Sequence, residues 1–215
     1  MPTWLYLQQP ARKRRTVPTG IALRDVRRQL FDAAERVLLR DGPSALTSRA
    51  VTTEAGCAKG VLHRHFPDFD GFLAEFVLDR VHRLDEQTAS LSDSAGTGTV
   101  SDNLTRALTA LFESAAVAIV ALVTSRDGLR ARLRETWPVG VPVLTEAAIL
   151  IAEYLALERD RGRIAADADV DTLAAMLIGS VHLLYADRDS TPPDSETVRK
   201  IVTRIIITDL RNPHP

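Results

Sequence analysis

The sequence predicts an all-α protein. Apolar residues recur at steps of three and four along most of the chain, which is the period of a helix with one buried face. No segment alternates apolar and polar residues for long, as a half-buried strand would. Gly and Pro residues fall between the periodic segments and divide them into separate helices. A chain of 215 residues has room for one large or two modest domains.

The first predicted helix runs from Leu23 to the Gly42-Pro43 pair. Glycine supplies a left-handed cap and proline forbids continuation, so this pair marks a helix end. The apolar stripe of this helix consists of Leu23, Val26, Leu30, Ala33, Ala34, Val37 and Leu38. Residues 1–20 show no sustained periodicity, and we interpret them as a flexible basic arm carrying Arg12, Lys13, Arg14 and Arg15. The arm is either solvated or in contact with DNA, and both interpretations stay open.

Two short helices follow, over residues 47–55 and 58–65, with Gly56 in the turn between them. Each has about two turns, too few for stability in isolation, so the first helix must support both. Three helices in this order are typical of a helix-turn-helix domain. We therefore predict a three-helix DNA-binding head over residues 21–68.

Residues 69–215 are predicted to form a helical regulatory, ligand-binding and dimerisation body. Its first four helices are expected over about residues 70–91, 102–123, 126–135 and 144–160, with a Ser/Thr/Gly linker at 90–100 and a loop at 137–142. Two C-terminal helices follow. The first is capped by Asp169 or Asp171, and the second begins after a break at residues 189–193.

The last helix is too apolar for a solvent-exposed chain end. Its stripe consists of Val198, Ile201, Val202, Ile205, Ile206 and Leu210, and the helix before it contributes Leu173, Leu177, Val181 and Leu184. These faces can form half of a four-helix bundle across a two-fold axis. We expect a homodimer through the last two helices, with part of the final stripe facing the protein's own core.

The composition indicates a soluble, cytoplasmic protein. A single cysteine, Cys57, excludes an internal disulfide framework. The longest strictly apolar run, residues 115–123, is far shorter than the roughly 20 residues that span a bilayer. The first residues have no apolar core of a secretory signal, so neither export nor membrane association is expected.

The net charge of −1 conceals a division of charge along the chain. Residues 1–66 hold 12 Lys and Arg against 5 Asp and Glu, which gives +7, while the remainder carries −8. A basic small segment joined to an acidic large one is typical of a head that binds a polyanion.

The head divides into residues expected to face inward and residues expected to face DNA. Val51, Ala55, Leu62 and Phe66 are expected to pack against the first helix. The residues expected at the DNA are Thr47, Arg49, Ala58, Lys59, Gly60, Val61, His63, Arg64 and His65. Thr47, Lys59 and His63 would contact phosphates mainly. Arg49 and Val61 would reach base edges, since an apolar side chain can touch a thymine methyl.

In this head the chain resembles the TetR family of transcriptional regulators. The resemblance covers about residues 23–80 and rests on Gly42, Thr47, Ala55-Gly56, Lys59-Gly60, His63-Arg64-His65-Phe66 and Pro67. It implies a repressor that leaves a palindromic operator in double-stranded DNA when a small, largely apolar ligand binds. A helix-turn-helix regulator without such a ligand, controlled by a protein partner, is the alternative.

The head also departs from the family's pattern. Ala58 stands where the family usually has a hydroxyl that caps the recognition helix, and His63 and His65 stand where it has Tyr. Phe69 replaces a basic residue that would contact phosphate. Ser48 and Thr52 replace smaller or apolar residues. The resemblance therefore implies DNA binding with an altered set of contacts.

No pattern of catalytic or metal-binding residues accompanies the head. The chain has no Ser/His/Asp order, HExxH motif or phosphate-binding loop, so an enzyme or scaffold is the less favoured alternative. His63 and His65, two positions apart on a helix, point to different faces and do not indicate a metal site. No cofactor or metal is expected.

A ligand site is expected inside the body, between the helix at 102–123 and those that follow it. The candidate wall and hydrogen-bonding residues are Phe112, Trp137, Tyr154 and His182. The loop at 137–142, with two prolines and a glycine, is the candidate entrance. Mainly apolar lining favours an apolar ligand.

Overall fold

The structure, a computed structural model, describes residues 20–186 and 192–207. All regular secondary structure in these two ranges is helical, which confirms the predicted fold class. Residues 1–19 of the arm predicted over 1–20, most of the break at 189–193, and Leu210 lie outside the described residues, while Gly20 begins α1. The helices are α1 (Gly20–Asp41), α2 (Ser48–Glu54), α3 (Gly60–His65), α4 (Phe69–Asp93), α5 (Val100–Glu113), α6 (Ala116–Ser125), α7 (Asp127–Thr136), α8 (Pro142–Asp160), α9 (Val170–Tyr185) and α10 (Ser195–Ile206).

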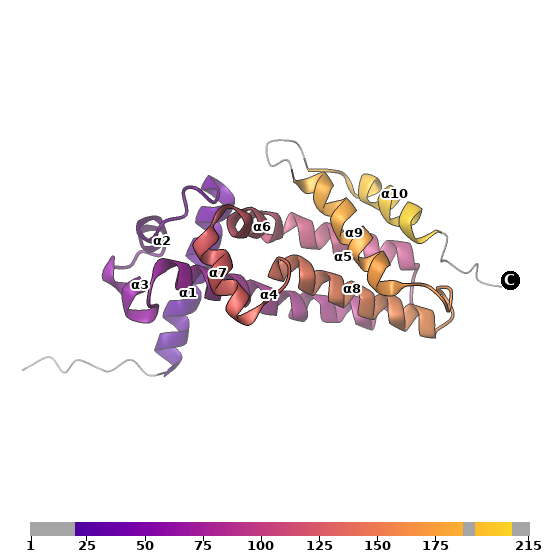
Figure 1. Ribbon diagram of the computed structural model, residues 1–215, viewed down its shortest axis with the longest axis horizontal. Helices are drawn as coiled ribbons and strands as arrows, with labels where there is room; N and C mark the ends of the chain where they lie inside the picture. Colours follow the sequence, from indigo (N-terminus) through magenta and orange to yellow (C-terminus); the bar gives the residue numbers. More distant parts are fainter. Residues whose placement is uncertain (1–19, 187–191, 208–215) are drawn as a thin grey trace, which may run out of the picture.

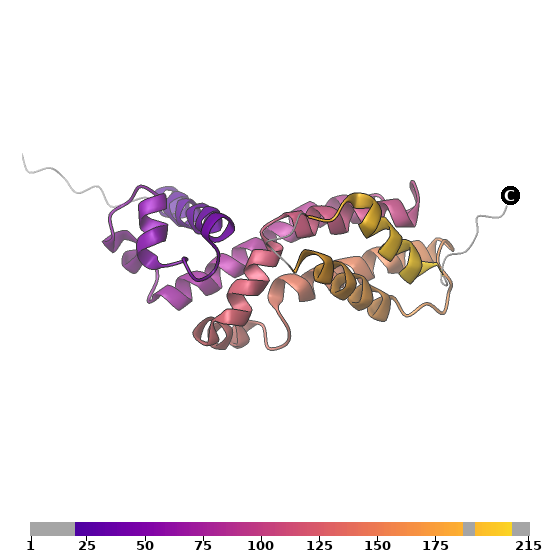
Figure 2. The same ribbon diagram turned by 90° about the horizontal axis from the view of Figure 1, so that it is seen from above.

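The head lies at one end of an elongated molecule, and α4 extends from it through the body (Figures 1 and 2). In the body α8 packs along α4, α9 packs on α8, and α10 packs on α5 and α9. Helix α7 packs on α4, and α6 contacts α1. The corner between α6 and α7 therefore lies against the head.

An aromatic cluster joins the head to the body. Phe31 of α1, Phe66 at the end of α3 and Phe72 of α4 pack with ring centroids 4.9–5.8 Å apart. Phe72 is fully buried at the centre of this cluster. The buried guanidinium of Arg80 on α4 adds ion pairs to Asp32 and Glu35 of α1. The head is thus packed on the first half of α4 rather than tethered by a linker.

The helix predicted over residues 102–123 is wrong in one respect, because the chain breaks at Ser114. The residue has extended backbone (φ −79°, ψ −169°), and α5 and α6 meet there at 53°. The Ser114 hydroxyl donates to the Leu111 carbonyl and accepts from the Ala116 amide at 3.2 Å, so it ends one helix and begins the next. Among the described helices none alone has the length and apolarity to cross a membrane, although α5 and α6 together would by length and composition.

Side-chain caps set the starts of the body's C-terminal helices. Asp169 accepts from the Thr172 amide at 3.1 Å and begins α9, as predicted. Asp194 accepts from the Thr197 amide at 2.8 Å and begins α10. Hydrogen bonds from Thr172 and Thr197 hold the pKa of these two carboxyl groups below the ordinary value for Asp. Helix α4 runs to Asp93, a little further than expected.

Candidate nucleic-acid interface

Helix α2 is fixed at both ends. The Thr47 hydroxyl accepts from the Ala50 amide at 3.1 Å and caps its start. At its end the Gln29 amide of α1 donates to the Ala55 carbonyl at 2.8 Å, and Gly56 adopts the left-handed conformation (φ +64°) that turns the chain toward α3. Glu54 accepts from Arg36 and Arg40 of α1. Helix α1 therefore supports α2, as the length of the short helices requires.

The inward set of residues is confirmed, since Val51, Ala55, Leu62 and Phe66 are all at least 93% buried. Thr47 and Arg49 of the predicted outward set are exposed. Around α3 the exposed residues are Ala58, Lys59, Gly60, His63 and Arg64. Two positions of the set, Val61 and His65, are only half-exposed, and DNA contact stays a prediction for the whole set.

The first of these, Val61, packs partly against the core beneath α3, so only part of its side chain faces outward. The second is His65, whose carbonyl accepts from the Arg27 guanidinium at 3.3 Å. Val61 and His65 are partly buried because α3 is short, so that the turns on either side of Leu62 contact the supporting helices. The outward face of α3 is therefore narrower than the sequence pattern indicates.

Lys59 is the N-cap residue of α3, but its side chain makes no capping hydrogen bond and its backbone is helical (φ −47°, ψ −35°). This agrees with the loss of a capping hydroxyl at Ala58 noted above. The Val61 amide instead donates to the Ala58 carbonyl at 2.9 Å in a single turn. Lys59 is consequently exposed at the leading end of α3, where nothing in the described chain holds its ammonium group.

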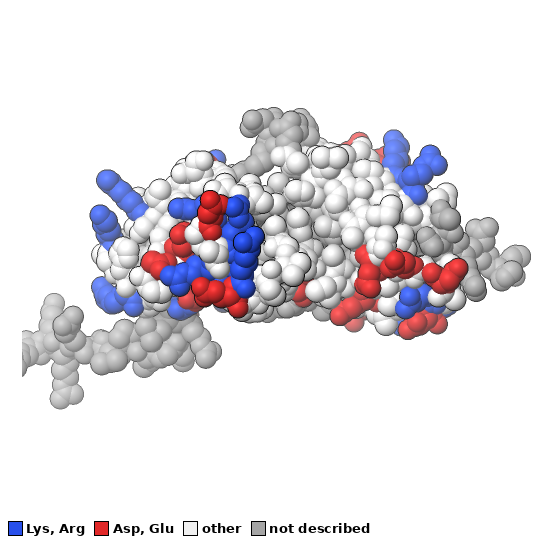
Figure 3. Space-filling model, in the orientation of Figure 1, with Lys and Arg blue, Asp and Glu red and all other residues white. Residues whose placement is uncertain are grey.

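Cations in the head fall into two groups. Those of α1 that face the rest of the protein are paired: Arg27 with Glu75, Arg36 with Glu54, and Arg40 with Asp41 and Glu54. Arg49, Lys59 and Arg64 have no carboxylate within ion-pair distance among the described residues. Figure 3 shows Lys and Arg side chains projecting from the tip of the head, with mixed charges nearer the body. The tip therefore has the excess positive charge that phosphate binding needs.

An open groove of about 490 Å³ runs along the outer face of α2. Its lining residues are Arg40, Thr47, Arg49, Ala50, Thr53 and Glu54. It places the Arg49 side chain beside the capped start of α2. An arginine in this position can reach a phosphate or form a bidentate hydrogen bond with guanine.

The four candidate ligand residues do not come together in one place. Phe112 is buried and stacks on Tyr185 at 5.6 Å, with the half-buried His182 ring at 5.8 Å. Tyr154 is buried among Asn103 and Glu158. Trp137 ends α7 and is half-buried. These residues serve three separate parts of the core.

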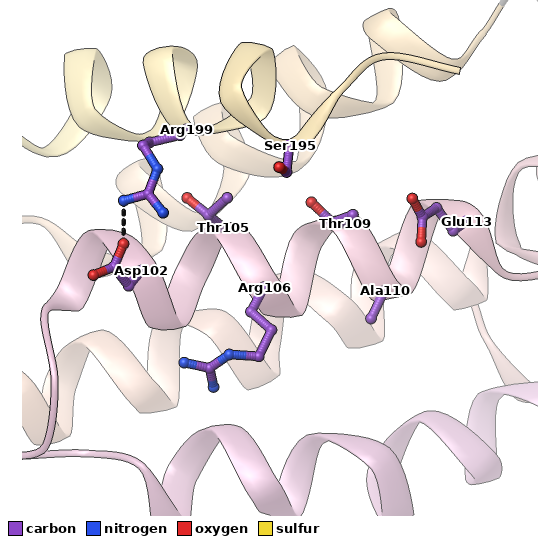
Figure 4. Close-up of a pocket in the computed structure, with 8 residues that line it drawn as sticks. All are labelled: Asp102, Thr105, Arg106, Thr109, Ala110, Glu113, Ser195 and Arg199. Carbon is purple, nitrogen blue, oxygen red and sulfur yellow. Dashed lines mark hydrogen bonds and ion pairs between the residues drawn. The ribbon is translucent and has the colours of Figure 1, made fainter. Parts of the chain in front are cut away.

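Two hollows in the body differ in character. An apolar cavity of about 50 Å³ lies between α4, α5 and α8, lined by Leu84, Leu91, Ala107, Leu111, Ala147, Leu150 and Ile151. An open groove of about 500 Å³ lies along the surface where α5 and α10 meet, and the ion pair of Arg199 with Asp102 lies at its edge (Figure 4). None of the four candidate ligand residues lines either hollow. Among the described residues no three His, Cys, Asp or Glu are placed to hold a metal ion.

Two residues that were not predicted as functional, Arg126 at the α6–α7 corner and Arg132 of α7, contact the head. Arg126 donates to the Leu46 carbonyl at 3.1 Å, and Arg132 pairs with Asp68. No local sequence pattern predicts either contact, because both form only when α7 packs on the start of α4.

Comparison with known families identifies the head. Residues 30–76 match the family described as bacterial regulatory proteins, tetR family. No curated protein sequence matches the chain. The match covers the supporting half of α1, both short helices and the start of α4, which are the elements that build the interface described above.

Solved structures share the fold over nearly the whole chain. NemR of E. coli, in its reduced form, superposes with a TM-score of 0.69 at 13% identity, covering 89% of this chain and 100% of that one. The fatty acid degradation regulator FadR of Bacillus halodurans gives 0.64 at 18% identity, with coverages of 84% and 94%. FadR of Bacillus subtilis, solved in complex with stearoyl-CoA, gives 0.62 at 17%, with coverages of 83% and 97%. The matched family is described as regulatory proteins, and the two FadR structures are described as a fatty acid degradation regulator and a transcriptional regulator.

Proposed function

We propose that this chain, which carries the DNA-binding head of the tetR family on a TetR-type regulator fold, is a cytoplasmic homodimeric repressor that a small, largely apolar ligand releases from a palindromic operator. The observation that carries the proposal is a set of exposed cations on the tip of the head that have no carboxylate partner among the described residues. Arg49, Lys59 and Arg64 lie on the two helices that the family uses to bind DNA. The body with its apolar cavity supports the ligand-controlled part of the proposal.

In this proposal α3 enters the major groove. Lys59, Thr47 and His63 contact phosphates, while Arg49 reaches a base edge. Ala58 and Gly60 are small, so the backbone at the start of α3 can approach the duplex closely. Val61 offers only the exposed part of its side chain to a thymine methyl. Arg64 and His65 lie at the far end of α3, where they meet the next phosphate.

Lys59→Ala is expected to weaken binding to every duplex alike and to lower the salt dependence of binding by about one counterion. The reason is that Lys59 is exposed and neutralises a phosphate without reading a base. Titrations over a range of salt, on an operator selected from random sequences and on a random duplex, measure both effects. Lys200→Ala, an exposed lysine of α10, is the matched control. An unchanged salt slope in Lys59→Ala would contradict the docking of α3.

The proposed dimer uses only part of the apolar stripe on the last two helices. Val198, Val202 and Ile206 are buried in the protein's own core, while Ile201 and Ile205 are half-buried. On α9 the side chains of Met176 and Leu183 are 49% and 75% exposed. Gly179 lies between them with open space above its Cα. The second copy is therefore proposed to cover Met176, Gly179 and Leu183 together with Ile201 and Ile205.

Leu183→Glu is expected to leave the protein largely monomeric at micromolar concentration, because the new carboxylate would be desolvated in the interface. Sedimentation velocity reports the oligomeric state. Val139→Glu is the matched control, since Val139 is equally exposed but lies in the loop before α8. Ile205→Glu is expected to give monomers or insoluble protein. A Leu183→Glu variant that stays fully dimeric would place the interface elsewhere.

The ligand is proposed to enter between α4, α5 and α8. The cavity there is much smaller than the roughly 300 Å³ or more of a typical ligand site, so binding must move these helices apart. Helix α4 continues into the head, so its movement changes the spacing of the two heads. Stearoyl-CoA in B. subtilis FadR supports an apolar chain as the ligand class. A thermal-shift screen of fatty acyl compounds, followed by operator release, tests this. Binders that leave DNA occupancy unchanged favour control by a protein partner.

A further inference from the structure

Arg126 occupies the corner between α6 and α7. Its backbone is extended (φ −125°, ψ 105°), so it ends one helix and begins the next. Its side chain is about one-third exposed and reaches from the body into the head. The Nη1 group donates to the carbonyl of the buried Leu46 at 3.1 Å. The guanidinium also lies over the Phe69 ring at 5.3 Å and 3.9 Å from the Asp70 carboxylate.

The Leu46 carbonyl, to which Arg126 donates, lies just before the start of α2. Leu46 directly precedes Thr47, the residue that caps α2. Helix α2 in turn packs on α3. Arg126 therefore fixes the backbone at the start of the helix-turn-helix pair, and it does so from the body.

Phe69 accounts for one departure from the family's pattern. The resemblance leads us to expect a basic residue here, at a phosphate. Phe69 instead stacks on Phe72 at 5.7 Å and presents its ring to Arg126. An arginine over an aromatic ring gains cation–π attraction. This position has thus exchanged a contact with DNA for a contact with the α6–α7 corner.

The rest of α7 holds the same junction. Arg132 pairs with Asp68, and Asp68 accepts from the Gly71 amide at 2.7 Å as the cap of α4. A Cβ on Gly128 would collide with the Asp70 carboxylate, so any other residue here would displace that side chain. The corner is therefore seated on the point where the head joins α4.

The head consequently has two attachments to the body. One is the aromatic and ionic packing of α1 on α4, through Phe72 and Arg80. The other is the α6–α7 corner, through Arg126. A movement of the corner relative to α4 would reach the start of α2 through the hydrogen bond of Arg126 to Leu46, whereas Phe72 and Arg80 hold α1 on α4.

We infer that Arg126 is a positioning residue that sets the orientation of α2 and α3 relative to the body. The contacts of Arg126 do not depend on the proposed function, but their importance for DNA binding rests on it. Arg126 touches no DNA. It acts through the Leu46 carbonyl and the Phe69 ring.

Hydrogen–deuterium exchange on the full-length Arg126→Ala protein tests the inference without DNA or ligand. We expect faster exchange in peptides covering residues 44–56 and unchanged exchange in α9. Arg130→Ala is the matched control, because Arg130 lies one turn further along the chain, in α7, and its guanidinium bonds only Thr124 and Asp127 among the described residues. Unchanged exchange at 44–56, an equal increase throughout the chain, or the same local increase in Arg130→Ala would overturn the inference.

DNA binding supplies a second readout. Arg126→Ala is expected to lower affinity for the selected operator about tenfold, the effect of one lost hydrogen bond to a charged group, with the salt slope unchanged. A lowered slope would show that Arg126 contacts phosphate and would overturn the inference. Failure of the wild-type protein to bind any DNA would refute the proposed function, whereas the exchange result would still decide the role of Arg126.

Discussion

Phe72→Ala is expected to lower the free energy of unfolding by about 3–5 kcal/mol, the cost of truncating a fully buried aromatic residue. Phe72 lies at the joint between head and body. Its ring meets Phe66 edge-on at 4.9 Å and Phe31 at 5.6 Å. Removing it opens a cavity lined by rings from α1, α3 and α4. Those rings cannot close the gap without moving the head.

Urea denaturation monitored by circular dichroism measures the loss, and Leu39→Ala is the control. Leu39 lies on α1 but is 47% exposed, so its truncation is expected to cost no more than about 0.5 kcal/mol. Because Phe66 ends α3, the Phe72 variant is also expected to lose operator affinity at temperatures where it is still folded. A loss of stability below about 1 kcal/mol would mean that head and body are not joined through this cluster.

Much of the fold could be predicted because helix signals are local. The stripe from Leu30 to Leu38, the Gly42-Pro43 stop and the Asp169 cap each act within a few residues, and each is confirmed. The break at Ser114 could not be predicted in the same way. No glycine or proline marks it, and the serine ends α5 only because its hydroxyl serves both helices.

The site was predictable as far as burial follows periodicity. Leu62 and Phe66 face inward, and Lys59 and His63 face outward, as helical spacing requires. Val61 departs from this pattern because its exposure depends on how closely α3 packs on its supports. The contact of Arg126 with the head could not be predicted for a related reason, since its partner Leu46 is 80 residues away in sequence.

The apolar stripe of α10 illustrates a further limit. Periodicity identifies Val198, Ile201, Val202, Ile205 and Ile206 as apolar, but it does not separate residues that face the chain's own core from those that face a partner. Packing of α10 against α5 and α9 distinguishes the two groups, because it buries Val198, Val202 and Ile206 in the chain's own core. The candidate ligand residues failed to converge for the same reason. Large side chains are informative about burial and uninformative about which neighbours surround them.

Glu158 near the end of α8 is a fully buried carboxylate. This end of α8 lies at the end of the body opposite the head (Figure 1). Its Oε1 accepts from the Tyr154 hydroxyl at 2.7 Å and from the Gly96 amide at 3.2 Å. Its Oε2 lies 3.2 Å from the Arg163 guanidinium. The Tyr154 hydroxyl in turn accepts from Asn103 at 3.1 Å. This network fastens the loop between α4 and α5 to the end of α8.

Burial and the adjacent Glu158 carboxylate raise the pKa of Tyr154 above its ordinary value, so the hydroxyl stays protonated and donates. Glu158→Ala would leave this donor and the Gly96 amide unsatisfied in the core, and the Arg163 charge without its partner. Breaking a buried ion pair by removing one member costs about 3–5 kcal/mol. Glu158→Gln keeps an acceptor oxygen but loses the charge, so a smaller loss is expected.

Glu158→Ala is therefore expected to lower the free energy of unfolding by about 3–5 kcal/mol, measured by urea denaturation. Glu153→Ala is the matched control, because Glu153 is exposed on the same helix. Operator affinity per folded molecule should be unchanged, since the network touches neither α4's junction with the head nor Arg126. This separates the two ends of the molecule: variants at Phe72 change stability and DNA affinity together, while Glu158→Ala changes stability alone. A fall in affinity for the folded Glu158→Ala protein would mean that the loop between α4 and α5 transmits its position to the head along α4.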